Sequence, residues 1–203
     1  MPTAADTVAT HLPRELQLQL AQEVRNVVRR SPLVRPRTPG GRNMRVLVSA
    51  AGKLGWVGDG AYHYSPVDAS KMPWPRMPAT WSRIATEVAG DHPWDSAIIN
   101  WYPLDAGLGW HQDISEVDTS RPIVTISLGD SAQWAIRRNP GAPTTRCQLD
   151  SGDVTLLKGL SRLYEHTIER IIPNPLFSPL RKPGRLSITV RVAGEPCLKP
   201  SQS

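Results

Sequence analysis

The sequence predicts a mainly β fold in which two early helices pack against a late antiparallel β body. Two stretches with helical spacing of apolar residues lie within residues 13–89, and short β-type runs follow one another from residue 97 onwards. Turn sequences such as LDAGLG, NPGAP and LDSGD separate these runs. Many short strands divided by Gly, Pro and Asp turns are typical of an antiparallel sandwich or barrel. At 203 residues, the chain is expected to form a single domain, residues 1–203.

The two helices are expected at about residues 13–30 and 78–89. In the first, the apolar residues at helical spacing are Leu16, Leu20, Val24, Val27 and Val28. Pro13 suits its first turn, and the basic pair Arg29 and Arg30 suits its last turn. In the second, the residues on one side are Trp81, Ile84, Ala85 and Val88, and Gly90 ends the helix.

The strands are expected mostly after the second helix. Their runs are residues 97–102, 123–128, 133–137, 154–157, 164–168 and 186–192, with one earlier strand at 44–50. Residues 31–43 are rich in Pro, Gly and Arg and read as a loop, and residues 65–78 hold four prolines that exclude a central strand or helix. No strand is expected in residues 1–12.

Composition limits the classes of function. Lys and Arg number 24 against 18 Asp and Glu, and the resulting charge of +6 fits either attraction to nucleic acid phosphates or a surface kept soluble. No apolar run of about 18 residues occurs, so no membrane-spanning helix is expected, and the first residues do not resemble a secretory signal. Two cysteines, Cys147 and Cys197, exclude a disulfide scaffold and a cysteine zinc site, and suit the cytoplasm.

The strongest chemical signal is His111-Gln112-Asp113. In an extended segment, His111 and Asp113 lie on one face and can hold a metal with one further ligand. His166, in a later strand-like run, is the preferred third ligand, with His63 and His92 as competitors. Two histidines and a carboxylate form the facial triad of non-haem Fe(II) oxygenases, although a catalytic zinc site has the same ligand count.

The last strand carries a second signal. Alternation places Arg185, Ser187, Thr189 and Arg191 on one face, opposite the apolar residues Leu186, Ile188 and Val190. Such arginines are often solvated, but two of them on one face can also clamp a small dicarboxylate through paired hydrogen bonds. Asn100 and Tyr102, two residues apart in an earlier strand, can add further donors. A triad with this clamp indicates a 2-oxoglutarate-dependent oxygenase.

The chain resembles the AlkB family of Fe(II)/2-oxoglutarate-dependent dioxygenases, which oxidatively dealkylate nucleobases. The resemblance covers about residues 15–194. In chain order its motifs are TPGG (38–41), LGW (54–56), YHYSP (62–66), WPRMP (74–78), NWY (100–102), HQD (111–113), RPIV (121–124), SLG (127–129), SGDV (151–154), SRL (161–163) with His166, and the strand from Arg185 to Arg191. Each motif is weak alone, and their ordered combination is specific.

The resemblance implies a double-stranded β-helix (jelly-roll) core, about residues 96–194. Residues 15–95 would form the N-terminal helices and a nucleotide-recognition lid, with short tails at both ends. It further implies that Fe(II) is bound by His111, Asp113 and His166, and that 2-oxoglutarate is bound by Asn100, Tyr102, Arg185, Ser187 and Arg191. Residues implied to contact the substrate are Trp56 and Tyr62, with Ser115 and Glu116 near the base and Arg138 at the mouth. The implied reaction consumes O2 and releases succinate, CO2 and formaldehyde.

Two of the predicted site residues depart from the family pattern. Ser115 stands where the family often has an acid that contacts the base, and Glu116 follows it as a partial replacement. Because serine carries no charge and both donates and accepts, the site is expected to favour cationic lesions less and to admit neutral bases such as 1-methylguanine. Ser187 replaces an asparagine between the two clamp arginines, which removes one hydrogen bond to the cosubstrate.

Several alternatives stay open on the sequence alone. The oxygenase reading also allows a small molecule or a protein side chain as substrate. A non-catalytic nucleic-acid-binding module and a zinc hydrolase fit less well, because neither uses the triad and both arginines together. Single-stranded DNA or RNA is the favoured partner, since no long hairpin rich in apolar wedge residues stands out to open a duplex. A monomer without membrane association is expected.

Overall fold

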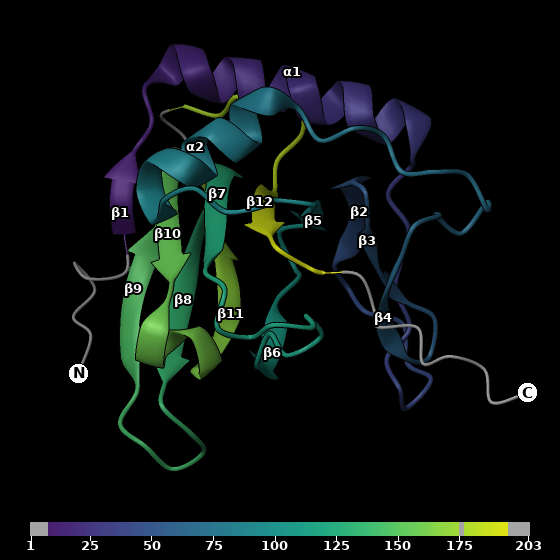
Figure 1. Cartoon of the computed structure of the whole chain (residues 1–203). Coiled ribbons are helices and arrows are strands. Elements are labelled where there is room, and N and C mark those ends of the chain that lie inside the picture. Colours follow the sequence, from purple (N-terminus) through teal and green to yellow (C-terminus); the bar gives the residue numbers. More distant parts are fainter. Residues whose placement is uncertain (1–7, 175–176, 195–203) are drawn as a thin grey trace, which may run out of the picture.

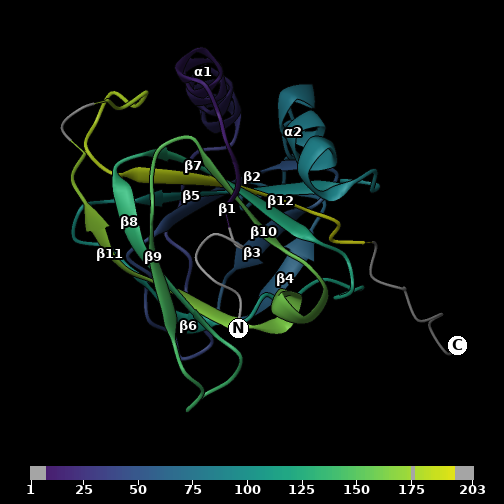
Figure 2. The same ribbon diagram turned by 90° about the vertical axis from the view of Figure 1, so that its left-hand side faces the viewer.

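The computed structural model describes residues 8–174 and 177–194, and its strands form two facing sheets and a separate hairpin. The larger sheet has the order β1-β10-β7-β12-β5-β2, and the smaller has the order β6-β11-β8-β9. The hairpin joins β3 to β4. All strand pairs in these sheets are antiparallel, as the turn-rich sequence predicts. Figures 1 and 2 show both helices on one side of the larger sheet.

The helices lie close to their expected places. Helix α1 spans Arg14–Arg30, and its buried residues recur on one face: Gln17, Leu20, Ala21, Val24 and Val27. Helix α2 spans Ala79–Ala89, buries Trp81, Ile84 and Ala85, and ends at Gly90, whose φ of 93° favours glycine. These faces pack on the outer surface of the larger sheet and bury the first hydrophobic core. No helix of the described residues has the length and apolarity needed to cross a bilayer.

The strands confirm the expected β body and extend it. The larger sheet consists of β1 (Val8–His11), β2 (Leu47–Gly52), β5 (Ser96–Tyr102), β7 (Ile123–Gly129), β10 (Asp153–Leu157) and β12 (Arg185–Arg191). The smaller sheet consists of β6 (Leu108–His111), β8 (Ser131–Arg137), β9 (Thr145–Leu149) and β11 (Glu165–Ile172). The hairpin consists of β3 (Gly55–Gly58) and β4 (Tyr62–Ser65).

The expectation of no strand before the first helix is wrong for the described part of residues 1–12. Strand β1 pairs with the edge of the larger sheet, with Val8 opposite Thr155 and His11 opposite Asp153. His11 Nδ1 lies 2.9 Å from the Asp153 carboxylate. These contacts are made with residues about 140 positions away, so no local pattern in a four-residue strand could reveal them.

The central strand β12 separates two environments by simple alternation. Leu186, Ile188 and Val190 face the helices within the first core. Arg185, Ser187, Thr189 and Arg191 face the space between the two sheets, where a cavity is lined by them. All residues of β12 are buried, so the arginines are not solvated as such a pattern often is. The second core fills the rest of this space around Trp134, Ile136 and Ile168.

Candidate active site

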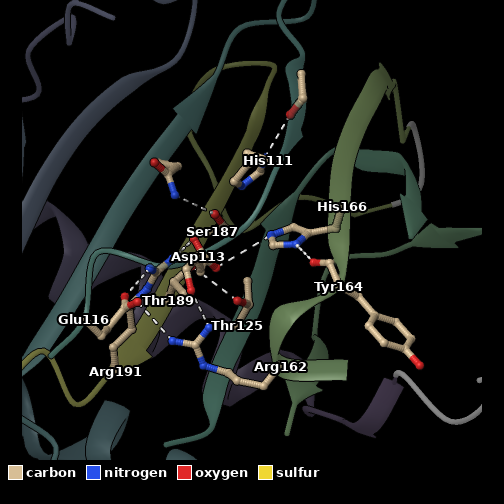
Figure 3. Close-up of polar contacts among 12 residues, drawn as sticks. His111, Asp113, Glu116, Thr125, Arg162, Tyr164, His166, Ser187, Thr189 and Arg191 are labelled. Atoms are coloured by element: carbon tan, nitrogen blue, oxygen red, sulfur yellow. Dashed lines mark hydrogen bonds and ion pairs between the residues drawn. The ribbon is translucent and has the colours of Figure 1, made fainter. Parts of the chain in front are cut away.

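The three predicted metal ligands meet between the sheets. His111 ends β6, His166 lies near the start of β11, and these two residues are directly paired across the strands. Asp113 follows β6 in a loop. The ligand atoms of His111, Asp113 and His166 all lie within 4.8 Å of one another, and the His166 Nε2 atom is 3.6 Å from Asp113 Oδ2 (Figure 3). The geometry therefore selects His166 over the two competing histidines.

The competing histidines lie elsewhere. His63 is exposed on the hairpin and has its Nδ1 atom 3.8 Å from the Asp59 carboxylate. His92 packs its ring edge-on against Trp94, with ring centroids 5.1 Å apart. Neither belongs to the cluster of metal-ligand side chains found among the described residues.

Backbone carbonyls orient both histidine ligands. His111 Nδ1 lies 2.8 Å from the carbonyl oxygen of Gly109, and His166 Nδ1 lies 3.3 Å from that of Tyr164. A carbonyl only accepts, so each Nδ1 donates, and in the neutral form of a ring this leaves the Nε2 lone pair free. This arrangement is typical of metal-bound histidines, whose second nitrogen is held by an outer partner.

Burial and neighbouring charges keep His166 and Asp113 in the protonation states that a metal requires. Burial lowers the pKa of His166 to about 4, although the nearby Asp113 opposes the shift, so the ring is neutral near pH 7. Burial alone would raise the pKa of the Asp113 carboxyl, but Arg191 and the two histidines outweigh it and hold that pKa well below its usual range. A neutral His166 imidazole and an ionised Asp113 carboxylate suit a divalent cation of the iron group.

We expect the metal-free protein to lose stability as the pH falls below about 6.5. The pKa of His166 is about 4 when folded but about 6.5 in an unfolded chain. Between these pH values the unfolded chain binds a proton that the folded protein does not. The free energy of unfolding therefore decreases as the pH is lowered, by up to about 3 kcal/mol. Urea unfolding in a chelating buffer at several pH values measures this. A His166→Gln variant with the same pH dependence would contradict the assignment.

A cavity beside the triad contains every residue predicted to hold the cosubstrate. It is lined by the triad together with Asn100, Tyr102, Arg185, Ser187 and Arg191. Arg185 is fully buried, and its Nη2 atom donates to Ser127 Oγ at 2.9 Å. In the described part of the chain, its Nε and Nη1 atoms have no hydrogen-bond partner, and neither has Arg191 Nε. Buried guanidinium groups with unpaired donors fit an anionic ligand, such as the dicarboxylate 2-oxoglutarate.

A second cavity lies beside two of the metal ligands. It is lined by His111 and Asp113 and by three residues predicted to contact the substrate, namely Trp56, Tyr62 and Ser115. The Trp56 and Tyr62 rings lie 5.0 Å apart on the β3–β4 hairpin. Gly58 makes room for them, because a Cβ atom there would come within 2.9 Å of the Trp56 ring. The hairpin therefore presents an aromatic wall to the metal site.

The structure places Glu116 differently from the substrate contact that the sequence predicted. Its carboxylate is buried and lines neither cavity. Glu116 Oε1 accepts hydrogen bonds from Tyr64 at 2.7 Å and Arg191 at 2.6 Å, and Oε2 accepts one from Arg162 at 3.0 Å. Each of these partners comes from a distant segment, so adjacency to Ser115 was a poor guide. Arg138 is exposed in the connection after β8 and also lines neither cavity.

Sequence reasoning assigned no role to three residues of the site. Met44 lines the second cavity, and Tyr64 and Arg162 bond to Glu116. Tyr64 and Arg162 belong to the family motifs YHYSP and SRL, which was the available signal. Burial raises the pKa of Tyr64, so its phenol remains a hydrogen-bond donor.

Two facing antiparallel sheets that enclose a two-histidine, one-carboxylate triad define a non-haem iron oxygenase of the jelly-roll class. The profile of the 2OG-Fe(II) oxygenase superfamily matches residues 7–191. The chain belongs to this superfamily and, within it, to the AlkB-like dioxygenases. It is therefore an Fe(II)- and 2-oxoglutarate-dependent dioxygenase that uses O2, which rules out both the zinc hydrolase and the non-catalytic module.

The relatives show how far the similarity extends. The chain is 37% identical over 187 residues to the alpha-ketoglutarate-dependent dioxygenase AlkB of Escherichia coli (strain K12), covering 87% of this chain and 85% of that protein. It is 35% identical over 133 residues to the nucleic acid dioxygenase ALKBH1 of Homo sapiens, covering 61% of this chain and 33% of that protein. The solved structure of OsALKBH1 superposes with a TM-score of 0.77 at 22% identity, covering 91% of this chain and 94% of that chain, which confirms the fold.

Proposed function

We propose that this enzyme removes alkyl groups from the bases of single-stranded DNA or RNA. The aromatic cavity beside the metal ligands carries the proposal, because Trp56 and Tyr62 offer stacking surfaces in the same cavity that His111 and Asp113 line. A base must leave its stack to reach a buried metal, and aromatic side chains offset part of that cost. Relatives named as a nucleic acid dioxygenase and as a DNA N(6)-methyladenine demethylase support it.

One cavity would bind the cosubstrate and the other would bind the base. Arg185 and Arg191, with Asn100, Tyr102 and Ser187, would bind 2-oxoglutarate. The bound iron, with 2-oxoglutarate and O2, supplies the oxidant for an N-alkyl carbon, and the overall products are the free base, an aldehyde, succinate and CO2. Trp56 and Tyr62 would hold the base over the triad and exclude water, which directs the oxidation to the alkyl group.

An arginine-rich rim favours a polyanionic strand over a small molecule. Residues 35–45 contain four arginines and no acidic residue, in a chain with a net charge of +6. This loop packs along the aromatic hairpin, since the Arg37 amide donates to the Gly58 carbonyl at 2.7 Å, and its Met44 lines the substrate cavity. Among the described residues, no carboxylate pairs with the exposed side chains of Arg37 or Arg42.

We expect each rim arginine that contacts a phosphate to contribute to the salt dependence of binding. Replacing Arg37 and Arg42 by glutamine should weaken single-strand binding and reduce the slope of log affinity against log salt by about 0.7 for each contact. Fluorescence anisotropy with a labelled oligonucleotide at several salt concentrations measures the slope. Arg83→Gln, on the exposed face of α2 and paired with Glu87, is the matched control. An unchanged slope in the double variant would place the strand elsewhere.

Mass spectrometry of single-stranded oligonucleotides tests the proposed reaction. Each oligonucleotide carries one methylated base and is incubated with the enzyme, Fe(II), 2-oxoglutarate and ascorbate. Loss of one methyl group that requires both 2-oxoglutarate and His111 is the expected result, and His111→Ala is the control. If 2-oxoglutarate is consumed while every DNA and RNA oligonucleotide stays methylated, the substrate is a small molecule or a protein side chain instead.

We expect Ser115 to broaden the range of bases that are accepted. Ser115 lines the substrate cavity, and its hydroxyl can donate to a carbonyl or accept from an amino group. Ser115→Asp should raise the preference for the cationic lesions 1-methyladenine and 3-methylcytosine over 1-methylguanine and 3-methylthymine by about tenfold, equivalent to about 1.4 kcal/mol. Competition between lesions in one reaction measures the ratio. The same ratio in both proteins would remove Ser115 from base selection.

We further propose that the chain works as a monomeric single domain in the cytoplasm. Support comes from its length and from its two cysteines, of which Cys147 is a free, half-buried thiol and Cys197 lies outside the described residues. Sedimentation of the loaded enzyme tests the monomer, and a sedimenting dimer would overturn it.

A further inference from the structure

The iron ligand Asp113 lies outside the sheets, in contrast to the two histidines. His111 and His166 are fixed by strand pairing between β6 and β11. Asp113 follows the last residue of β6, and the described structure assigns no strand to residues 112–122. A ligand on such a segment needs other contacts to hold it where the metal binds, because a loop has no hydrogen-bond ladder of its own.

Arg162 supplies the central contact. It lies in the 3-10 turn Gly159–Leu163 and is 1% exposed. Its guanidinium donates to three acceptors in three directions: Nη1 to the backbone carbonyl of Asp113 at 2.5 Å, Nε to the carbonyl of Arg121 at 2.8 Å, and Nη2 to Glu116 Oε2 at 3.0 Å. The three acceptors belong to the loop that carries the ligand. Figure 3 shows Arg162 reaching this loop from the turn below His166.

A further hydrogen bond has its donor on the loop and its acceptor on the turn. The Gln112 side chain donates through Nε2 to the carbonyl of Leu163 at 2.6 Å. The ligand loop and the turn before β11 are therefore joined by two side chains, Arg162 with three hydrogen bonds and Gln112 with one. Because the turn leads directly into the strand that carries His166, these bonds connect the segments of two metal ligands.

Glu116 links Arg162, through Arg191, to the carboxylate of Asp113. Glu116 accepts from Arg162 on one oxygen and from Arg191 on the other. Arg191 Nη2 in turn lies 3.0 Å from Asp113 Oδ1. Arg162 thus holds the backbone of Asp113 directly, and through Glu116 it holds the arginine that faces the Asp113 side chain. Both buried charges of the Arg162–Glu116 pair are compensated, as buried ions require.

We propose that Arg162, supported by Glu116 and Gln112, is a positioning residue that pre-forms the Asp113 corner of the metal site and so sets the affinity for the divalent ion. An ordered ligand loses less conformational freedom when the metal binds, which is why outer partners of metal ligands strongly affect affinity. The proposal concerns the metal site alone and holds for any substrate of the enzyme, so it does not depend on the nucleic acid reaction.

Titration of the metal-free protein with Co2+, followed by its visible absorption, tests the proposal without turnover. Arg162→Met should raise the Kd for Co2+ by about 10- to 100-fold. Arg162→Lys should give an intermediate value, because one ammonium cannot serve three acceptors with the geometry of the guanidinium fork. Arg146→Met is the matched control, since Arg146 also pairs with a glutamate but is largely exposed on the smaller sheet. Its Kd should equal that of the unaltered protein.

Gln112→Ala keeps the test decisive if Arg162→Met fails to fold. Gln112 is exposed, so its removal leaves no buried charge without a partner. We expect an unchanged melting temperature without metal and a severalfold higher Kd for Co2+, a combination that a purely structural role would not produce. A Co2+ affinity within twofold of the unaltered protein in Gln112→Ala, or in folded Arg162→Met, overturns the proposal.

Discussion

Replacing His166 by alanine is expected to abolish metal binding, the conversion of 2-oxoglutarate to succinate, and the demethylation of the substrate. His166 is the half-buried ligand on β11, and without it the ion keeps only His111 and Asp113. Because loss of a mere outer partner already costs 10- to 100-fold, loss of a ligand should cost more than about 100-fold in metal affinity. Succinate release, oligonucleotide demethylation and Co2+ titration should all fail together in this variant.

His63→Ala is the matched control for the missing ligand. The sequence alone leaves His63 as a competitor for the third position, but the structure places it on the exposed hairpin beside Asp59. Its replacement should leave Co2+ binding and succinate release without substrate unchanged. Equal loss in both variants would contradict the triad, as would a His166→Ala protein that still releases succinate at the normal rate.

The elements that the sequence predicts well are those whose own residues carry the pattern. Helix α1 repeats buried residues at 3.6-residue spacing over 17 residues, and α2 does so before a terminating glycine. The long central strands are apolar or strictly alternating, as in β7 and β12. In each case the apolar residues of the buried face recur with the period of the element, so periodicity alone locates it.

The missed strands are short and depend on distant partners. β1, β3, β4 and β6 have four residues each, which is too few for an alternating pattern to differ from chance. β9 reads Thr-Arg-Cys-Gln-Leu and looks polar, because its buried side meets the second core through Leu149 while its other side faces solvent. Their pairing is decided by neighbours in the sheet, which no local window contains.

Some residues of the site could likewise be predicted from local sequence, and others depend on distant partners. The shared face of Arg185, Ser187, Thr189 and Arg191 could be predicted because strand alternation fixes which side chains of one strand lie together. The triad needed the HQD motif and a distant histidine, because Asp113 lies in a loop and His166 comes from another strand. Glu116 could not, because its three partners are 46 to 75 residues away and the loop turns its carboxylate inwards. Arg162 was visible only as part of a motif. Its function depends on two carbonyl groups, and backbone acceptors leave no trace in a sequence.

Replacing Arg185 by methionine should separate cosubstrate binding from stability. Arg185 is buried, and its Nε and Nη1 atoms have no hydrogen-bond partner within residues 8–174 and 177–194. If both bind a carboxylate of 2-oxoglutarate, their loss removes two charge-assisted hydrogen bonds of at least about 1.5 kcal/mol each, which corresponds to an increase of about 100-fold in the KM for 2-oxoglutarate. The rate at saturating cosubstrate should change less than the KM.

The same substitution should leave the cosubstrate-free protein at least as stable. A buried guanidinium with unpaired donors costs free energy, and an apolar side chain of similar length removes that cost. Melting with and without 2-oxoglutarate measures both effects. Arg185→Met should keep its melting temperature but lose the increase that the ligand produces by mass action.

Arg170→Met is the control, because Arg170 is an exposed arginine on β11. It should behave like the unaltered protein in both measurements. If Arg185→Met melts earlier and still gains stability from 2-oxoglutarate, Arg185 supports the fold and another residue holds the cosubstrate. If Arg185→Met instead melts no earlier and gains no stability from 2-oxoglutarate, the buried Arg185 charge on β12 is kept because a carboxylate of the cosubstrate pairs with it.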